Sequence, residues 1–200
     1  MKIPKPKLIG LILLVCGLQT SAQFKLSKLP RVPVTNNDLR INLQKVIADF
    51  PNQFAELRGD TLELNPQTVE YASRLEFGMA PMNSIMEYRG LEPRYSWQAQ
   101  IINTEEFEEA SKKYDWLCKQ LKVMTIKLDG GYTFSLNGNY EAPDDARGFS
   151  SSIYKLTPNA SNMPRLKIEV SMQFEFPEWK VVLSVYEKER EDHERGEIEE

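Results

Sequence analysis

Histidine and cysteine are almost absent from this sequence of 200 residues. The only histidine, His193, lies in a charged tail, so a histidine-activated nucleophile or a zinc site with histidine ligands has almost nowhere to form. Of the two cysteines, Cys16 falls in a leader segment described below, which leaves Cys118 without a partner for an intramolecular disulfide. We therefore expect the fold to depend on its hydrophobic core, with Cys118 as a small buried hydrophobic residue.

Motifs for nucleotide chemistry and acyl transfer are also missing. The chain has no glycine-rich loop that could cradle phosphates and no nucleophile elbow of the Gly-x-Ser-x-Gly kind. Its formal net charge of −4 gives no electrostatic footprint for nucleic acid. These absences favour functions other than nucleotide-dependent catalysis or nucleic-acid binding.

Acidic residues do cluster, and each cluster has a structural explanation. The four glutamates between positions 105 and 109 open a predicted helix, where they complement its dipole. Residues 129–145 lack the ordered spacing of a calcium-binding loop, and Asp144 and Asp145 are typical of a solvated turn. We predict no metal, no cofactor and no catalytic residue, with a carboxylate-dependent hydrolase as the alternative.

The N-terminus has the pattern of an export signal. Three lysines within residues 2–7 precede an apolar run at 8–18, and Thr20-Ser21-Ala22 supplies the small residues of a cleavage site. The run is well short of the ~20 residues that span a bilayer. We predict a signal peptide at 1–22 and a bacterial periplasmic or extracellular location, peripheral to the membrane at most. An uncleaved anchor and a lipid on Cys16 are the alternatives.

The composition defines the limits of one predicted domain. Residues 23–35 contain two prolines and no clear period, which is typical of a tether. Residues 187–200 hold eight acidic and three basic residues and no apolar stripe, so we assign 188–200 to a charged tail. The prediction is a single α+β domain at 36–187.

The clearest strand pattern lies at 165–176, RLKIEVSMQFEF. Large apolar residues alternate there with polar ones, as expected for a strand with one buried and one wet face. The predicted buried side chains are Leu166, Ile168, Val170, Met172, Phe174 and Phe176. This strand therefore requires a layer that covers its apolar face.

Two amphipathic segments can supply that layer. The first begins at Asn36 or Asn37, is interrupted by Pro51, and is expected to end at a left-handed Gly59. The second begins at Asn103, with Glu106 as its capping-box partner. Their apolar stripes are Leu39, Leu43, Val46, Ile47 and Phe50 in the first, and Phe107, Ala110, Tyr114, Leu117 and Leu121 in the second.

Further alternating segments complete the predicted sheet. They lie at 62–64, 69–77, 95–101, 126–128, 132–136, 149–157 and 179–185, whereas 78–93 has no clear period. Asn137-Gly138 predicts a tight hairpin, and Pro177-Glu178 predicts the turn before the last strand. The fold prediction is an antiparallel sheet of about six to eight strands with two helices packed on one face.

The predicted order of helix, three strands, helix and several strands resembles the small α+β fold of type III secretion chaperones. Residues 49–54, DFPNQF, with Leu57 and Gly59, resemble the opening of an uncharacterised family of small exported bacterial proteins. Secretion chaperones are cytoplasmic and this chain has an export pattern, so the resemblance implies a fold and carries no activity.

Two aromatic residues fall off the cleanest apolar stripes. Trp116 and Tyr140 are the aromatic side chains that we expect to be exposed, where they could stack on a sugar or anchor a partner protein. The predicted function is an exported, non-catalytic binding module of the cell envelope whose ligand is an envelope protein or a glycan. A structural subunit of a cell-surface assembly is a further alternative.

Overall fold

A computed structural model describes residues 36–128 and 131–187. The predicted signal peptide, tether and charged tail lie outside these residues. Within the described part, no helix has the length and apolar character that crossing a membrane requires. The helices and strands are α1 (Asn36–Asp49), η1 (Phe50–Asn52), β1 (Arg58–Leu64), β2 (Thr68–Ser73), β3 (Met82–Tyr88), β4 (Arg94–Thr104), α2 (Phe107–Lys122), β5 (Thr125–Lys127), β6 (Thr133–Asn139), η2 (Asp145–Arg147), β7 (Phe149–Thr157), β8 (Leu166–Glu175) and β9 (Glu178–Glu187).

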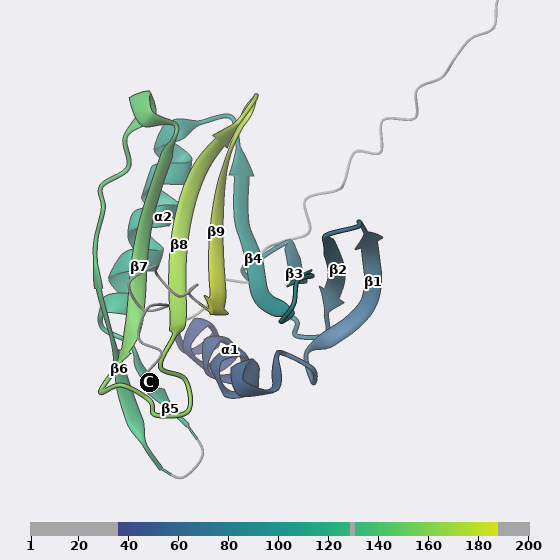
Figure 1. Ribbon diagram of the computed structural model, residues 1–200. Coiled ribbons are helices and arrows are strands. Elements are labelled where there is room, and N and C mark those ends of the chain that lie inside the picture. Colours follow the sequence, from purple (N-terminus) through teal and green to yellow (C-terminus); the bar gives the residue numbers. More distant parts are fainter. Residues whose placement is uncertain (1–35, 129–130, 188–200) are drawn as a thin grey trace, which may run out of the picture. The chain divides into compact units, whose positions relative to one another are not determined.

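The strands form one antiparallel sheet in the order β1-β2-β3-β4-β9-β8-β7-β6-β5 (Figure 1). The predicted α+β class is confirmed, but the sheet has nine strands instead of six to eight. The missed strand is β3, whose only fully buried apolar side chain is Ile85, so its sequence carries almost no alternation. Each half of the sheet is a helix followed by a meander, and the halves meet where β4 pairs with β9.

Strand β8 has the two-faced character that its sequence predicts along most of its length. Leu166, Ile168, Val170 and Met172 are buried in the core. Phe174 and Phe176 are exposed, so the predicted buried stripe is wrong at its last two positions. They lie where β8 ends and the chain turns into β9. The opposite face is less wet than predicted, because Lys167 is only 7% exposed.

Helix α2 covers the middle of the sheet. It packs against β4, β6, β8 and β9, and its buried residues are Ala110, Tyr114, Leu117, Cys118 and Leu121. Its N-terminus differs from the prediction, because the N-cap residue is Glu106, which makes no side-chain capping bond, and not Asn103. The Thr104 hydroxyl oxygen accepts a hydrogen bond from Glu106 N–H at 3.2 Å and donates to Glu109 Oε2 at 2.8 Å.

Helix α1 buries Leu39, Leu43, Val46 and Ile47 in the same core cluster as α2. It also packs against the edge strand β5, where Gln44 Oε1 accepts a hydrogen bond from Lys127 N–H at 3.2 Å. Both helices therefore lie on the apolar side of the sheet, and within residues 36–128 and 131–187 no α-helix covers the other face of the central strands.

The helix does not end at Gly59 as expected. The left-handed residues are Gln53 and Phe54, and Asp49 fixes this turn by accepting bonds from Glu56 N–H and Leu57 N–H at 3.0 and 3.1 Å. Gly59 lies in β1, where an added Cβ would approach Ala72 O to 2.8 Å. This glycine is needed for close strand pairing and not for a left-handed turn.

Candidate functional site

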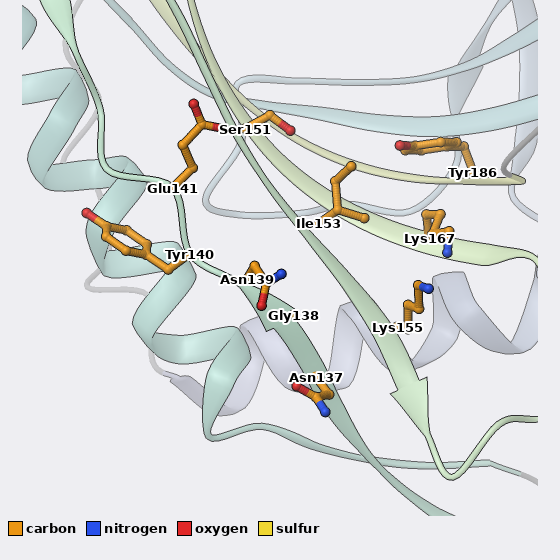
Figure 2. A pocket seen from close by; sticks show the side chains of 10 residues that line it. All are labelled: Asn137, Gly138, Asn139, Tyr140, Glu141, Ser151, Ile153, Lys155, Lys167 and Tyr186. Carbon is orange, nitrogen blue, oxygen red and sulfur yellow. The ribbon is translucent and has the colours of Figure 1, made fainter.

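A hollow of about 480 Å³ lies on the helix-free face of strands β6 to β9 (Figure 2). Its floor consists of outward-facing side chains of β7, β8 and β9, which alternate with the core residues of those strands. Its rim is the end of β6 and the two residues that follow. The lining residues are Asn137, Gly138, Asn139, Tyr140, Glu141, Ser151, Ile153, Lys155, Lys167 and Tyr186.

Gly138 allows the rim to lie close to β7. An added Cβ would approach Ile153 O to 2.2 Å, a distance at which the backbone would have to move. Asn137 and Gly138 therefore continue strand β6, and the tight hairpin predicted at this pair is wrong. The amide side chains of Asn137 and Asn139, two residues apart on one strand, both line the hollow.

Strand register defines two rows of side chains across the hollow. In one row, Asn139 on β6 pairs with Ile153 on β7, which pairs with Glu169 on β8. In the next row, Asn137 pairs with Lys155, and Lys167 on β8 pairs with Tyr186 on β9. The first row places a partly exposed apolar side chain in the floor, and the second carries two lysines.

Glu169 holds two neighbouring hydroxyl groups in place. Ser151 Oγ donates a hydrogen bond to Glu169 Oε1 at 2.5 Å. Burial, and then a hydrogen bond to the Glu169 carboxylate, raise the pKa of the Tyr186 phenol. Tyr186 is therefore a neutral phenol near pH 7, fixed beside Lys167 in the floor.

Tyr140 lies on the rim, and its side chain packs against α2. Its hydroxyl donates to Asp115 Oδ1 of α2 at 2.5 Å, and its ring centroid lies 6.3 Å from that of Tyr114. Burial, followed by the hydrogen bond to Asp115, raises the pKa of Tyr140 to about 12. The side chain is nevertheless 51% exposed, as the sequence predicts, but it points toward α2 and away from the floor of the hollow (Figure 2).

Ion pairs hold the segment between β6 and β7. Arg147 Nη1 lies 2.6 Å from Glu141 Oε1, and Arg147 Nε lies 3.1 Å from Asp144 Oδ2. The backbone N–H of Glu141 donates to the buried Ser152 Oγ at 2.9 Å. The Glu141 carboxylate on the rim thus has a cationic partner outside the hollow.

Trp116, the other predicted contact residue, does not line the hollow. It lies on α2, partly buried against the core, with Lys113 Nζ 4.7 Å from its ring centroid. The structure therefore places only Tyr140 of the two at this site. Sequence reasoning missed Lys167 and Tyr186 as site residues, although their alternation with core residues indicated an outward direction.

The described residues offer few groups for covalent chemistry. Residues 36–128 and 131–187 contain no group of three His, Cys, Asp or Glu side chains arranged to hold a metal ion. Cys118 is buried in the core, and this burial raises the pKa of its thiol. The hollow instead presents aromatic, amide, hydroxyl and ammonium groups, which recognise ligands by packing and hydrogen bonding.

A scan against protein-family models and searches among curated proteins and solved structures found no match to this chain.

Proposed function

We propose that this protein is a non-catalytic binding module of the bacterial cell envelope and that its ligand occupies the hollow on the helix-free face. The leader pattern at 1–22 supports export. The resemblance of residues 49–54 to exported bacterial proteins agrees with that location. The observation that carries the proposal is a cavity of ligand size in which polar and aromatic side chains converge.

Several of these side chains are already held in one position. Asp115 fixes Tyr140, Glu169 fixes Tyr186, and Arg147 fixes Glu141. A ligand that binds to such groups does not need to order them, and this lowers the entropic cost of association. The hollow is therefore suited to recognition.

Between the two predicted ligand classes, the lining favours a glycan. The partly exposed Ile153 in the floor can pack against the C–H face of a sugar ring. The side-chain amides of Asn137 and Asn139 supply both donors and acceptors for hydroxyl groups. One lining thus offers both kinds of contact that a sugar requires.

A glycan array probed with the purified protein tests this proposal. The blocking variant is Ile153→Trp, which places an indole in the floor, and the matched control is Ile41→Trp on α1. The two isoleucines are 40% and 39% exposed, so both substitutions replace a β-branched residue of similar exposure. We expect oligosaccharide binding by the wild type and by Ile41→Trp, and its loss in Ile153→Trp.

Two outcomes would reject the proposal. Glycan binding that is equal in both variants would mean that the ligand binds outside the hollow. The absence of any glycan binding would mean that the ligand is not a glycan. Release of reducing sugar from a bound oligosaccharide would replace the binding module with the carboxylate-dependent hydrolase. Thermal melts of both variants establish whether each is folded.

A further inference from the structure

The two edges of the sheet differ in how they are covered. Edge strand β5 has three residues, and α1 packs against it, with Lys127 N–H bonded to Gln44. Edge strand β1 has seven residues, and none of the described strands pairs with its outer side (Figure 1). On β1, Leu62 and Leu64 are 57% and 66% exposed. An open edge that carries apolar side chains invites pairing with another chain, which proteins usually prevent.

The pairing of β1 with β2 is irregular on both sides of Thr61. The register shifts between Arg58 and Thr61 and again between Thr61 and Glu63. Such bulges interrupt the ladder of backbone hydrogen bonds, and Asp60 and Glu63 place exposed charges beside them. Bulges and charges oppose the addition of a regular strand from a second copy of the chain. They do not, however, cover the two leucines.

Thr61 presents an accessible hydroxyl group at this edge. Its side chain is exposed and makes no hydrogen bond within residues 36–128 and 131–187. Asp60 before it and Leu62 after it are exposed as well. The order Asp60-Thr61-Leu62 resembles an O-glycosylation site of some envelope bacteria. A free edge strand is also a segment that another protein can bind in extended form, so a transferase can reach this threonine.

We propose that Thr61 is an O-glycosylation site and that its glycan covers the open edge of the sheet at β1. The sugar donor is a glycosyl diphosphate on an isoprenoid lipid. The bond between the anomeric carbon and the diphosphate breaks, and a bond between that carbon and Thr61 Oγ forms. The hydroxyl proton passes to a basic group of the transferase, and the lipid diphosphate leaves. A bulky, hydrated glycan on this strand hinders the approach of a second strand.

This modification is independent of the ligand that we propose for the hollow. Strands β2, β3 and β4 lie between β1 and the strands β6 to β9 that carry the hollow. A glycan on β1 therefore leaves the hollow accessible. Failure of either proposal does not affect the other.

Mass spectrometry of the mature protein, purified from the envelope of the bacterium that encodes it, tests the assignment. We expect an intact mass above that of the polypeptide by at least one sugar residue. Fragmentation that preserves glycosidic bonds should locate this mass on Thr61. Alkaline β-elimination should release the glycan and leave a dehydrated residue at position 61. An intact mass equal to that of the polypeptide would overturn the proposal.

Variants expressed in the same bacterium assign the added mass to one hydroxyl group. Thr61→Val keeps the β-branched shape and should lose the added mass, whereas Thr61→Ser should retain it. Thr133→Val is the matched control, because Thr133 is also exposed on a strand but follows Tyr132 and not an acid. Added mass that persists in Thr61→Val would contradict the assignment. The mass of the wild type remains decisive if Thr61→Val does not fold.

Analytical ultracentrifugation tests whether the glycan protects the edge. The same mature chain, produced in a host that does not glycosylate it, should self-associate at a protein concentration at least about tenfold lower than the glycosylated form. Leu64→Lys in the unglycosylated chain should reverse this association, because a lysine on an edge strand opposes pairing. Equal self-association of the two forms would overturn the protective role. An unglycosylated dimer in the native envelope would assign the edge to a second copy and overturn the whole proposal.

Discussion

The two halves of the sheet differ in what covers their apolar faces. Helix α2 lies over the sheet (Figure 1) and packs against strands β4, β6, β8 and β9. Its buried stripe of apolar side chains covers them. Over β2 to β4, the segment between β2 and β3 supplies cover, since Leu75, Phe77 and Met79 are buried there. The Phe77 and Trp97 ring centroids lie 5.8 Å apart in an edge-to-face contact.

This difference shows that an apolar sheet face requires matched apolar volume and does not require a helix to provide it. The two halves also differ in function, because only one of them carries the hollow. The hollow lies over β6 to β9, whose inner face is fixed by α2 and by buried hydroxyl bonds. A rigid inner layer under the hollow keeps its lining residues in register.

Truncating a side chain in helix α2 and one in the segment between β2 and β3 tests whether the two contribute equally to stability. Phe77→Ala and Leu117→Ala each remove a fully buried side chain, so we expect each to lower the free energy of unfolding by about 2–5 kcal/mol. Val123→Ala, at a residue 77% exposed, is the control and should change it by less than about 0.5 kcal/mol. Urea denaturation measures all three. A silent Phe77→Ala would mean that the loop does not serve as cover.

A pair of glycines probes how closely each half is packed. Gly138→Ala would force a Cβ against the backbone of Ile153, so we expect a loss of about 1–3 kcal/mol or more. Gly78 has no heavy atom within 4 Å of the added Cβ, and Gly78→Ala should be neutral or slightly stabilising. Equal melting temperatures for the two variants would contradict the close approach of β6 to β7.

A pair of serines compares the polar groups inside the two halves. Ser73 Oγ accepts from the Trp97 indole N–H and from Leu75 N–H, each at 3.2 Å, whereas Ser152 Oγ accepts from Glu141 N–H and lies 2.7 Å from the Tyr114 hydroxyl. Each Ser→Ala variant leaves a donor without its partner, at a cost of about 1–3 kcal/mol. Ser152→Ala should cost more, because Ser152 is fully buried whereas Ser73 is only partly buried.

The combination of Ser152→Ala with Tyr114→Phe sharpens the serine comparison. The two groups share a hydrogen bond, so the double variant should lose less stability than the sum of the single losses. Strictly additive losses in urea denaturation would show that this bond does not couple α2 to β7.

The spacing of apolar residues along the sequence predicted much of this fold. The alternation in β8 and β9 and the apolar stripe of α2 mark faces that must be covered, and the structure confirms those faces except at Phe174 and Phe176. Local signals failed where a distant strand decides the role of a residue. Gly59 and Gly138 lie in short sequences that are typical of turns. Each is a glycine, however, because a neighbouring strand leaves no space for a Cβ.

The candidate site was predictable only in part. Tyr140 stood out because it interrupts the apolar pattern, and it is half exposed on the rim. Lys155 and Lys167 gave no such signal, since lysines on the polar face of a strand are ordinary. Their meeting depends on the register between β7 and β8, which are separated along the chain by the loop 158–165.

The smallest expected effect is a pKa change on the rim of the hollow. Burial and the bond to Asp115 raise the pKa of Tyr140 to about 12, above the value of about 10 in an unfolded chain. The folded state therefore retains this proton longer, and the corresponding stability is present below pH 10 and lost as the pH rises towards 12. Asp115→Asn should lower the pKa of Tyr140 because it removes the negative acceptor. Ultraviolet titration, with Tyr140→Phe to identify the phenol, measures that pKa, and an unchanged value in Asp115→Asn would show that Asp115 does not hold the ring.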